Sequence, residues 1–382
     1  MEPKKPKQKP KPPVKKSKPK LVENSASEDS TSENSKPYNF VSLSNNGKDI
    51  GKVAGHDKFD KKSVNGKLFL TLNVQTSTFV STGLTVLSSD ISDKNFDEVS
   101  LIKTSIQKGN KLVIPGSSLK GTIRSAYEAV TRSCLCKTKA YRDQTPRNYS
   151  ECKIKDNKKS VCPACQVFGA MGWQGLISFS DAVGHEDSNA IKFIPMLYQP
   201  DPECENYYQQ NGNIKGRKFY YHAKEVTRTG GKGVEAQVAA KKYVLKATLQ
   251  FRNISQAQLG TLLIVLGQDS KLFAQNPDFH DQNPKPCIAL KVGGGKPIGL
   301  GSMTAEVEAL EQPESLKERY SRYDIADSSR LTGDSLRDVM SVAIAAAYKD
   351  ATHKSLVEKT QLEALADILK WPTMRTAPED NY

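Results

Sequence analysis

Residues 113–132 read Val-Ile-Pro-Gly-Ser-Ser-Leu-Lys-Gly-Thr-Ile-Arg-Ser-Ala-Tyr-Glu-Ala-Val-Thr-Arg, and the neighbouring elements can be placed from this stretch. Its Pro-Gly pair ends a short apolar strand, and Ser117 or Ser118 then takes the position of a helix N-cap. From Leu119 to Cys134, apolar residues recur at helical spacing. The stretch therefore predicts a strand, a sharp turn and an amphipathic helix with one buried stripe.

A second stripe on the predicted helix is polar and recurs at intervals of four: Lys120, Arg124, Glu128 and Arg132. Its first two members are cations on the first two turns, where free backbone N–H groups and the helix dipole attract an anion. The pattern predicts a site for a phosphate or a carboxylate. An ordinary solvated helix face has the same spacing, so spacing alone does not separate the two interpretations.

The basic charge is concentrated at the start of the chain. Of a formal charge of +14 over 382 residues, residues 1–20 supply +8 through nine lysines and one glutamate. We expect residues 1–36 to be a disordered tail, first basic and then acidic and serine-rich, because they lack the apolar residues that a fold needs. The rest of the chain is too evenly charged for a general polyanion binder. It has no apolar run of membrane-spanning length, so we expect a cytoplasmic protein with no membrane partner.

Five of the seven cysteines fall within 32 residues. A long chain without a secretory signal is a poor setting for a disulfide framework, and such a dense cluster in a polar segment favours structural zinc. Cys162 and Cys165 form a knuckle that can share one tetrahedral ion, and Cys152 can supply a third thiolate. Either Cys134 or Cys136 completes the site, because Cys134 also falls on the apolar stripe of the predicted helix.

Alternating apolar residues predict two strands. The first carries Leu68, Leu70, Leu72 and Val74. The second begins at Leu245, and after it Ser255 is the expected N-cap of a buried helix that continues to Gln268. Residues 75–111 form a polar link between the first strand and the helix that follows Pro115. This link is longer than a connection inside a compact domain needs, so we expect it to be functional or mobile.

Two further segments have features that suit RNA. Residues 216–222 read Gly-Arg-Lys-Phe-Tyr-Tyr-His and interleave cations with aromatic rings, although a strand with a buried aromatic face explains them nearly as well. Residues 293–303 read Gly-Gly-Gly-Lys-Pro-Ile-Gly-Leu-Gly-Ser-Met between two predicted strands. Such glycines let a backbone approach a ligand closely, but they form neither a Walker loop nor a dinucleotide fingerprint. A flexible hairpin is the alternative.

Three of these segments, taken in order, resemble the RAMP superfamily, whose members are the backbone subunits of type III CRISPR effector complexes. The segments are residues 114–121, Ile-Pro-Gly-Ser-Ser-Leu-Lys-Gly; residues 162–169, Cys-Pro-Ala-Cys-Gln-Val-Phe-Gly, with Gly-Leu-Ile-Ser-Phe-Ser-Asp-Ala at 175–182; and the glycine-rich residues 293–301. Shorter likenesses occur at 37–41, 56–57 and 216–222.

The resemblance implies an α+β fold with a ferredoxin-like core of the RNA-recognition type. Residues 37–312 would form this RAMP domain. Its insertions would be a zinc-knuckle region at 135–165 and a thumb-like insertion at 186–240, and residues 313–382 would form a helical C-terminal extension.

The resemblance also implies a guide-RNA-binding subunit of a type III CRISPR antiviral ribonucleoprotein. Its partners would be guide RNA, target RNA, sister RAMP subunits and the large subunit of the effector complex. In the family, an aspartate on the loop before the helix cleaves target RNA with a divalent metal such as Mg²⁺. Asp97 lies nearest that position, and Asp93 is the alternative. We expect RNA contacts at Ser117, Ser118, Lys120, Arg124, Arg217, Lys218, Tyr220, Gly293, Gly294, Gly295 and Lys296.

Two other functions fit the same residues. One is a non-catalytic scaffold subunit of the same complex. The other is a free-standing RNA-binding protein that contains structural zinc and assembles with no partner. The RNA that co-purifies with the chain would distinguish these functions.

Overall fold

The computed structural model describes residues 36–58, 60–90, 101–136, 138, 144–154, 160–188, 190–197, 204–226, 232–274, 285–312, 323, 330–349 and 355–378. Contacts divide the chain into two units, Met1–Lys36 and Pro37–Tyr382. The predicted tail lies outside the described residues except for Lys36, and so do the candidate catalytic residues Asp93 and Asp97. All the elements below belong to the second unit.

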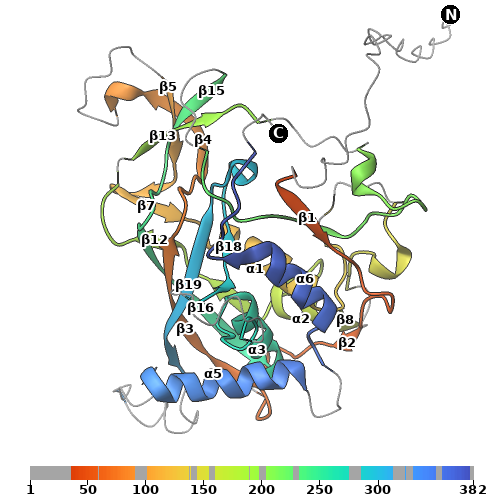
Figure 1. Cartoon of the computed structure of the whole chain (residues 1–382). Helices are drawn as coiled ribbons and strands as arrows, with labels where there is room; N and C mark the ends of the chain where they lie inside the picture. Colours follow the sequence, from red (N-terminus) through yellow and green to blue (C-terminus); the bar gives the residue numbers. More distant parts are fainter. Residues whose placement is uncertain are drawn as a thin grey trace, which may run out of the picture. The chain divides into compact units, whose positions relative to one another are not determined.

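A central antiparallel sheet organises this unit (Figure 1). Its main path has the strand order β18-β19-β3-β16-β12-β7-β6, while β11 pairs with β16 and β20 pairs with β19. The strands along the path are β18 (Leu290–Lys291), β19 (Ser302–Glu311), β3 (Val64–Val74), β16 (Val244–Ile254), β12 (Ala182–Gly184), β7 (Lys111–Ile114) and β6 (Gln107–Lys108). The two side strands are β11 (Ile177–Phe179) and β20 (Arg330–Leu331).

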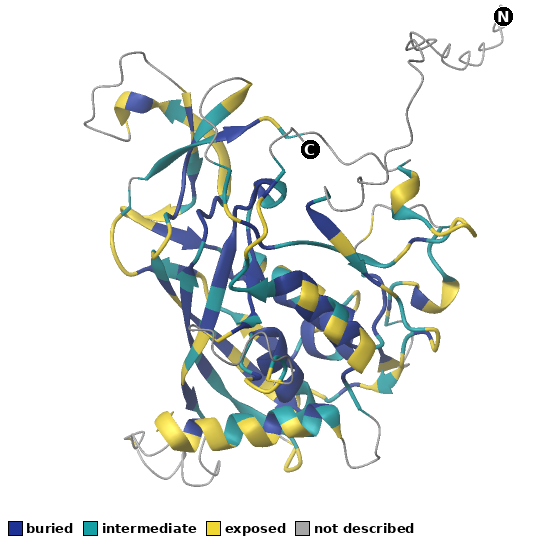
Figure 2. Ribbon diagram, in the orientation of Figure 1, coloured by how far each residue is buried: buried dark blue, intermediate teal, exposed yellow. Residues whose placement is uncertain are grey.

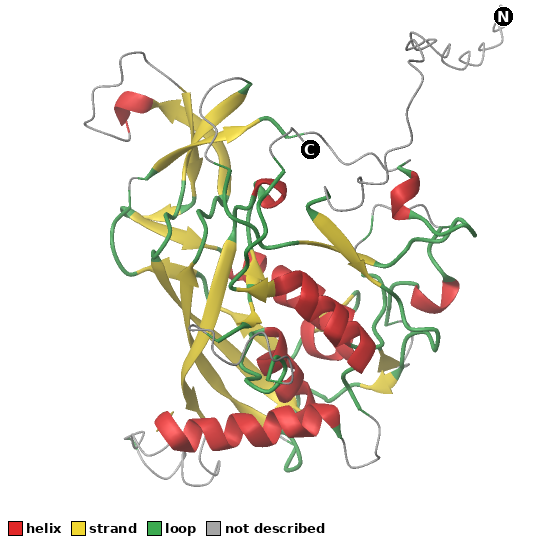
Figure 3. Ribbon diagram, in the orientation of Figure 1, coloured by secondary structure: helices red, strands yellow, loops and turns green. Residues whose placement is uncertain are grey.

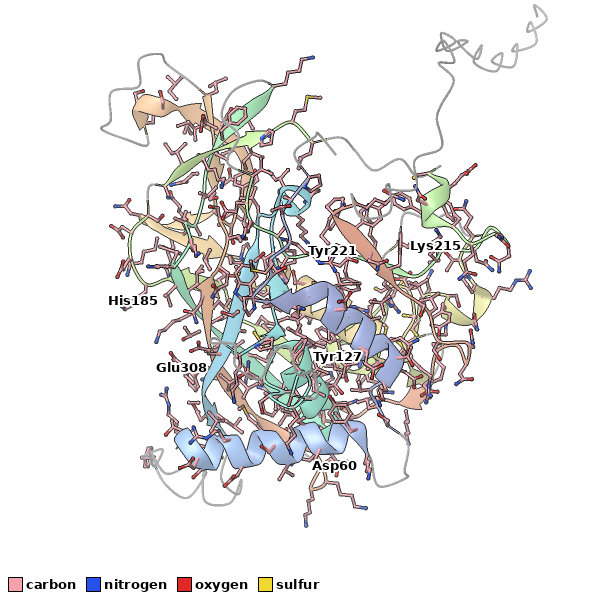
Figure 4. All side chains as sticks on the ribbon, in the orientation of Figure 1. Asp60, Tyr127, His185, Lys215, Tyr221 and Glu308 are labelled. Carbon is pink, nitrogen blue, oxygen red and sulfur yellow. The ribbon has the colours of Figure 1, made fainter. Side chains whose placement is uncertain are left out.

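The two faces of this sheet differ in polarity, because successive side chains of a strand point to opposite faces. On β3, four alternating side chains are each at most 2 % exposed: Leu68, Leu70, Leu72 and Val74. This burial confirms the predicted strand. The other face carries Glu308 of β19 (Figure 4). Its Oε1 atom forms an ion pair with Lys246 Nζ of β16 at 3.2 Å. One face of the sheet therefore contributes to the core, and the other stays polar.

Helices cover the apolar face of the sheet (Figure 3). They are α1 (Gly116–Val130), α2 (Pro163–Phe168), α3 (Gln256–Val265), α5 (Gly333–Tyr348) and α6 (Lys359–Leu369). The outer side of α5 is exposed, whereas α1 and α3 lie in the interior (Figure 2). At the crossing of α3 and α5, a Cβ on Gly260 would lie 1.8 Å from the carbonyl oxygen of Ala343. Glycine at this position therefore sets how closely the two helices pack.

The helix predicted from residues 113–132 is α1, and both of its ends differ from the prediction. It begins at Gly116, and neither candidate serine caps it. Asp181 Oδ1 accepts the Gly116 amide at 2.8 Å, so a carboxylate of the chain itself lies where the stripe predicted an anion. The helix ends at Val130, where the chain becomes extended, so Cys134 lies in the segment after the helix rather than on it.

The helix after β16 begins as predicted. The Ser255 side chain accepts the backbone N–H of Gln258, and the Gln258 side chain returns to the Ser255 amide, which makes a capping box. The helix ends at Val265, earlier than the predicted Gln268. Its residues from Leu259 onward are buried, as expected from their unbroken apolar run. The helices α5 and α6 lie within residues 313–382, where a helical extension is expected.

The polar link at residues 75–111 is more than a connection, because it contributes strands to a second sheet. This sheet has the order β13-β15-β5-β4, with β5 parallel to β15. Its strands are β13 (Ile191–Pro195), β15 (Gly233–Gln237), β5 (Leu101–Ser105) and β4 (Ser81–Leu87). The edge strand β4 is exposed along most of its length, so it lacks the apolar alternation from which a strand is predicted.

Four pairs of short strands complete the described structure. The pair formed by β1 (Tyr38–Val41) and β14 (Arg217–Tyr220) joins the start of the described chain to the predicted cation–aromatic segment. The others are β2 (Gly51–Lys52) with β8 (Ser160–Val161), β9 (Gly169–Ala170) with β10 (Trp173–Gln174), and β17 (Cys287–Ile288) with β21 (Lys370–Trp371). Residues 186–240 thus supply strands to two different sheets.

Candidate metal centre and glycine-rich loop

Four buried cysteines meet beside α1: Cys134, Cys152, Cys162 and Cys165. Their sulfur atoms all lie within 4.8 Å of one another. The Cys134 sulfur is 3.5 Å from that of Cys165 and 3.6 Å from that of Cys162. A tetrahedral zinc site with Zn–S bonds of about 2.3 Å has sulfur–sulfur edges of about 3.8 Å, so the four thiols fit such an ion. Cys136 lies apart from this group, with its sulfur 3.9 Å from a Glu151 carboxylate oxygen.

Local sequence explains why these thiols converge. Cys162 directly precedes α2, whose first residue is Pro163, and proline suits this position because it needs no N–H partner there. The Ala164 amide of α2 donates to Ser133 Oγ at 3.0 Å, which holds the segment after α1 against the knuckle. The Cys162 amide donates to the Cys152 sulfur at 3.4 Å, which links the knuckle to the third cysteine.

Two cations predicted to contact RNA are bound inside the protein beside this cluster. Arg124 Nε lies 2.7 Å from Glu128 Oε1, and Arg124 Nη2 lies 3.4 Å from the Cys165 sulfur. Arg217 Nη1 lies 3.0 Å from Glu128 Oε2, and Arg217 Nη2 donates to the carbonyl oxygen of Cys134 at 3.0 Å. The carboxylate of Glu128 thus joins α1 to β14.

The first turn of α1 is only partly accessible. Ser117 is exposed and Ser118 is half-buried. Lys120 Nζ donates to the carbonyl oxygen of Ile177 at 3.1 Å, and burial, with the nearby charge of Arg124, lowers the pKa of Lys120. The side of the helix that the sequence offers as a cationic stripe is therefore largely engaged with other parts of the chain.

The β1–β14 pair carries the remaining aromatic and cationic candidates. The ammonium of Lys218 lies 3.8 Å from the ring centre of Tyr38, 4.6 Å from that of Tyr207 and 5.0 Å from that of Tyr220. It also donates to the Tyr207 hydroxyl at 3.0 Å. Burial lowers the pKa of Lys218 to about 8. The predicted mixture of cations and rings is thus a local cation–π cluster, in which the rings contact the lysine.

The glycine-rich loop lies between β18 and β19 and packs against several other segments. Gly293, Gly295, Gly299 and Gly301 have φ angles of 82°, 68°, 89° and 84°, in the region that favours glycine. Added Cβ atoms would also meet neighbouring backbone; on Gly301, for example, one would lie 2.0 Å from the Val292 carbonyl oxygen. Gly294 is exposed, and its amide donates to the Phe79 carbonyl oxygen at 2.9 Å. The loop is therefore a defined structure rather than a loose hairpin.

The loop also joins the two sheets. Its Ile298 and Leu300 share a small apolar core with Ile194 of β13 and Ala236 of β15. In the sheet order, β19 and the start of α1 after β7 are separated by β3, β16 and β12. The loop and the helix start therefore leave different parts of the central sheet.

Polar residues that no sequence pattern predicted are buried beneath the loop. Lys291 Nζ lies 3.2 Å from the Gly299 carbonyl oxygen and 3.1 Å from Ser302 Oγ, and His222 Nδ1 lies 2.8 Å from the same hydroxyl. Burial, with the charge of Lys296, lowers the pKa of Lys291 to about 7. Burial, with the charge of Lys291, lowers the pKa of His222 to about 3. Burial also lowers the pKa of Lys296.

The fold and this centre define a mixed α/β protein with a buried four-cysteine cluster that can hold a metal ion such as zinc. The family model of the RAMP superfamily matches residues 71–304, more than half of the chain. The chain belongs to the RAMP superfamily.

Three solved structures are similar to the chain at low sequence identity. A chain of a Type IV-B CRISPR complex is 16 % identical with a TM-score of 0.31, covering 65 % of this chain and 93 % of that one. A chain of the Type III-B Cmr-beta complex bound to cognate target RNA is 13 % identical with a TM-score of 0.31, covering 65 % and 60 %. Csc2 of Thermofilum pendens is 11 % identical with a TM-score of 0.30, covering 82 % and 85 %.

Comparison with curated proteins finds no match. Among the residues that the structure describes, no helix combines the length and apolar composition needed to cross a bilayer.

Proposed function

We propose that the protein is a guide-RNA-binding backbone subunit of a type III CRISPR antiviral ribonucleoprotein in the cytoplasm. It acts there with sister RAMP subunits, the large subunit and target RNA. The observation that carries this proposal is membership of the RAMP superfamily over residues 71–304. The glycine-rich loop and the helix that follows Pro-Gly-Ser-Ser, both within this range, support it.

The order of elements supports a ferredoxin-like core within the RAMP domain. Along the chain, β3, α1, β12, β16, α3 and β19 alternate as in a βαββαβ unit. In the sheet, the corresponding strands have the order β19-β3-β16-β12, which places the first strand between the third and the fourth. On this reading, residues 135–165 form the zinc-binding insertion, residues 186–240 the thumb-like insertion and residues 313–382 the helical extension.

The experiment that tests the proposal is purification of the full chain from its native cell, followed by sequencing of the bound RNA and identification of bound proteins. A guide-binding subunit should bring one class of short RNA of defined length together with sister subunits. RNA of many sequences and lengths, with no other protein, would favour the free-standing zinc-containing RNA-binding protein instead.

Lys120 and Lys296 are the cations to test for guide-RNA contacts. Of the other predicted cations, Arg124 and Arg217 are ion-paired with Glu128, and Lys218 is enclosed by tyrosine rings. Lys120→Glu with Lys296→Glu should weaken binding to every RNA sequence alike and reduce its salt dependence, since backbone contacts act by releasing counterions. Lys61→Glu, at an exposed lysine outside both segments, is the control. Equal binding by the double variant and the control at several salt concentrations would contradict these contacts.

We further propose that Asp97 cleaves bound target RNA with a divalent ion such as Mg²⁺, and Asp93 is the alternative. RNA carries its own nucleophile in the 2′-hydroxyl, so one carboxylate with a metal ion that positions the phosphate is chemically sufficient. Asp97→Ala should remove one cleavage product while target binding changes by a factor of about three or less. If only Asp93→Ala removes a product, Asp93 is the catalytic residue. If neither does, the chain is a scaffold subunit.

A further inference from the structure

A continuous chain of charged side chains connects the metal centre to β14. It begins at the Cys165 sulfur, which is 3.4 Å from Arg124 Nη2. It continues through Glu128, whose two carboxylate oxygens accept from Arg124 at 2.7 Å and from Arg217 at 3.0 Å. Arg217 Nη2 then returns to the cluster by donating to the carbonyl oxygens of Ser133 at 2.8 Å and Cys134 at 3.0 Å.

Glu128 is buried and the two arginines are mostly buried, which makes these charges costly unless they are balanced. The side chains of Arg124, Glu128 and Arg217 are 19 %, 7 % and 10 % exposed. Two guanidinium groups and one carboxylate leave one positive charge in excess. Four thiolates with one divalent ion carry two formal negative charges. The excess cation therefore balances one of the two formal negative charges of the metal centre, whereas an ion pair alone would need only one arginine.

The directions of the hydrogen bonds also connect the two arginines with the metal centre. A buried arginine that served only Glu128 could place its remaining N–H groups toward water or a backbone oxygen. The second branch of Arg124 instead points at a ligand sulfur, where a charge-assisted hydrogen bond favours the thiolate over the thiol. Arg217 meanwhile holds the backbone oxygen of the residue that supplies another ligand. Both arginines therefore act on the segments that carry the thiols.

We propose that Arg124, oriented by Glu128, is a positioning residue of the metal centre, and that Arg217 holds the Cys134 segment in place for the same ion. This inference rests on the proposed zinc site. It assigns Arg124 and Arg217 to the metal centre rather than to guide RNA. It also makes the position of β14, and hence of the Lys218 cluster, depend on metal binding.

The test measures zinc affinity of the full chain by competition with a chromophoric chelator, together with the absorption spectrum of the Co²⁺-substituted protein. Arg124→Met keeps an unbranched apolar stem, although a shorter one, and removes the charge and the donors. It should weaken zinc binding by about 10–100-fold, as loss of a group that orients a metal ligand does. The sulfur-to-cobalt charge-transfer band should move to lower energy, because the Cys165 thiolate loses a hydrogen bond. Glu128→Gln should give a smaller change in the same direction.

Arg132→Met is the matched control. Arg132 lies two residues after the end of α1 and is also ion-paired, with Asp49 and Glu358, and among the described residues its guanidinium forms no hydrogen bond with the four cysteines. Its zinc affinity and cobalt spectrum should match those of the wild type. Arg124→Lys is the second variant, for the case that Arg124→Met does not fold, because it keeps the positive charge. It should also weaken zinc binding.

The possible results distinguish a failure of the proposed role of Arg124 from a failure of the proposed zinc site. Wild-type protein that binds no zinc overturns the site and the inference together. Zinc binding by the wild type, with the same affinity and spectrum in Arg124→Lys or Arg124→Met as in Arg132→Met, overturns the role of Arg124 and leaves the site intact.

Discussion

The metal centre and the glycine-rich loop each hold a largely buried cation, but the pKa values of these two cations shift in opposite directions. At the metal centre, the hydrogen bond and charge of Glu128 outweigh the effect of burial and raise the pKa of Arg124. Under the loop, Lys291 faces a carbonyl oxygen and a hydroxyl instead, and its pKa falls to about 7. Arg124 therefore keeps its charge at all pH values of interest, whereas Lys291 gives up a proton near neutrality. The pKa of a buried cation thus depends on whether a carboxylate or a neutral oxygen accepts its hydrogen bonds.

The largest difference between the two regions should appear when the metal is removed. Cys162→Ser with Cys165→Ser should abolish zinc binding and lower the melting temperature by more than about 10 °C, because the ion replaces a local hydrophobic core. Elemental analysis should show about one zinc ion per wild-type chain and none in the variant. Cys287→Ser, at a cysteine outside the cluster, should keep both the metal and the melting temperature. A metal-free wild type with unchanged melting would contradict the zinc site.

A smaller effect is expected from the buried lysine under the loop. The folded pKa of Lys291, about 7, lies below the ordinary value of 10.5, so the unfolded chain binds more protons between these values. This group therefore makes the protein more stable as pH rises from 7 to 10, by at most about 4 kcal/mol. Below pH 7 both states are protonated and the contribution of Lys291 no longer changes.

Lys291→Met should remove that part of the pH dependence, and urea unfolding at pH 7 and pH 10 measures it. Lys246→Met, at the exposed ion pair on the polar face of the sheet, is the control and should leave the slope as in the wild type. The same slope in Lys291→Met as in the control would show that this lysine keeps its ordinary pKa. The groups facing Lys291 are Lys296, Glu225 and His222, so their variants would report on the same network.

The smallest effect should come from the glycines of the loop. Gly301→Ala places a Cβ against the Val292 carbonyl at a φ of 84°, so we expect a loss of about 1–3 kcal/mol in the free energy of unfolding. Gly83→Ala is the matched control, because its φ is 89° but no atom lies within 4 Å of the added Cβ. It should cost less, about 1 kcal/mol. Equal losses at the two positions would mean that backbone conformation alone, without packing, fixes the loop.

The sequence patterns predicted the elements that bury one face. The alternation on β3, the apolar stripe of α1 and the N-cap Ser255 of α3 all depend on residues close together in the chain. The same patterns did not predict the second sheet, because the exposed strand β4 has no apolar alternation and its partner β5 is joined to the distant β15. Propensity and periodicity carry no information about such long-range pairing.

The candidate site also combines features that local sequence predicts with features that depend on long-range contacts. The sequence predicts metal ligands among five clustered cysteines and leaves Cys134 and Cys136 as alternatives. The path of the chain after Val130 places Cys134, and not Cys136, beside the other three thiols. Spacing along the sequence could not predict that Arg124 and Arg217 share Glu128 as a partner. Arg217 and Glu128 are 89 residues apart in the chain, and Arg217 lies on β14, which pairs with β1. Lys291 gave no sequence signal, and His222 belonged to the cation–aromatic segment without a predicted role of its own. Asp97 and Asp93 lie outside the described residues and stay a prediction.

The packing of the last helices has a consequence for how the chain is made. The apolar helix α3 is covered by α5, and α6 packs on α1, so elements after residue 333 close a core whose other walls come before residue 312. During synthesis, about 80 residues must follow α3 before α5, the helix that covers it, is complete. At a translation rate of about 5–20 residues per second, this interval is about 4–16 seconds. For that time the ribosome-bound chain exposes the Leu262–Leu266 run, and during this interval a chaperone that binds apolar segments would find it accessible.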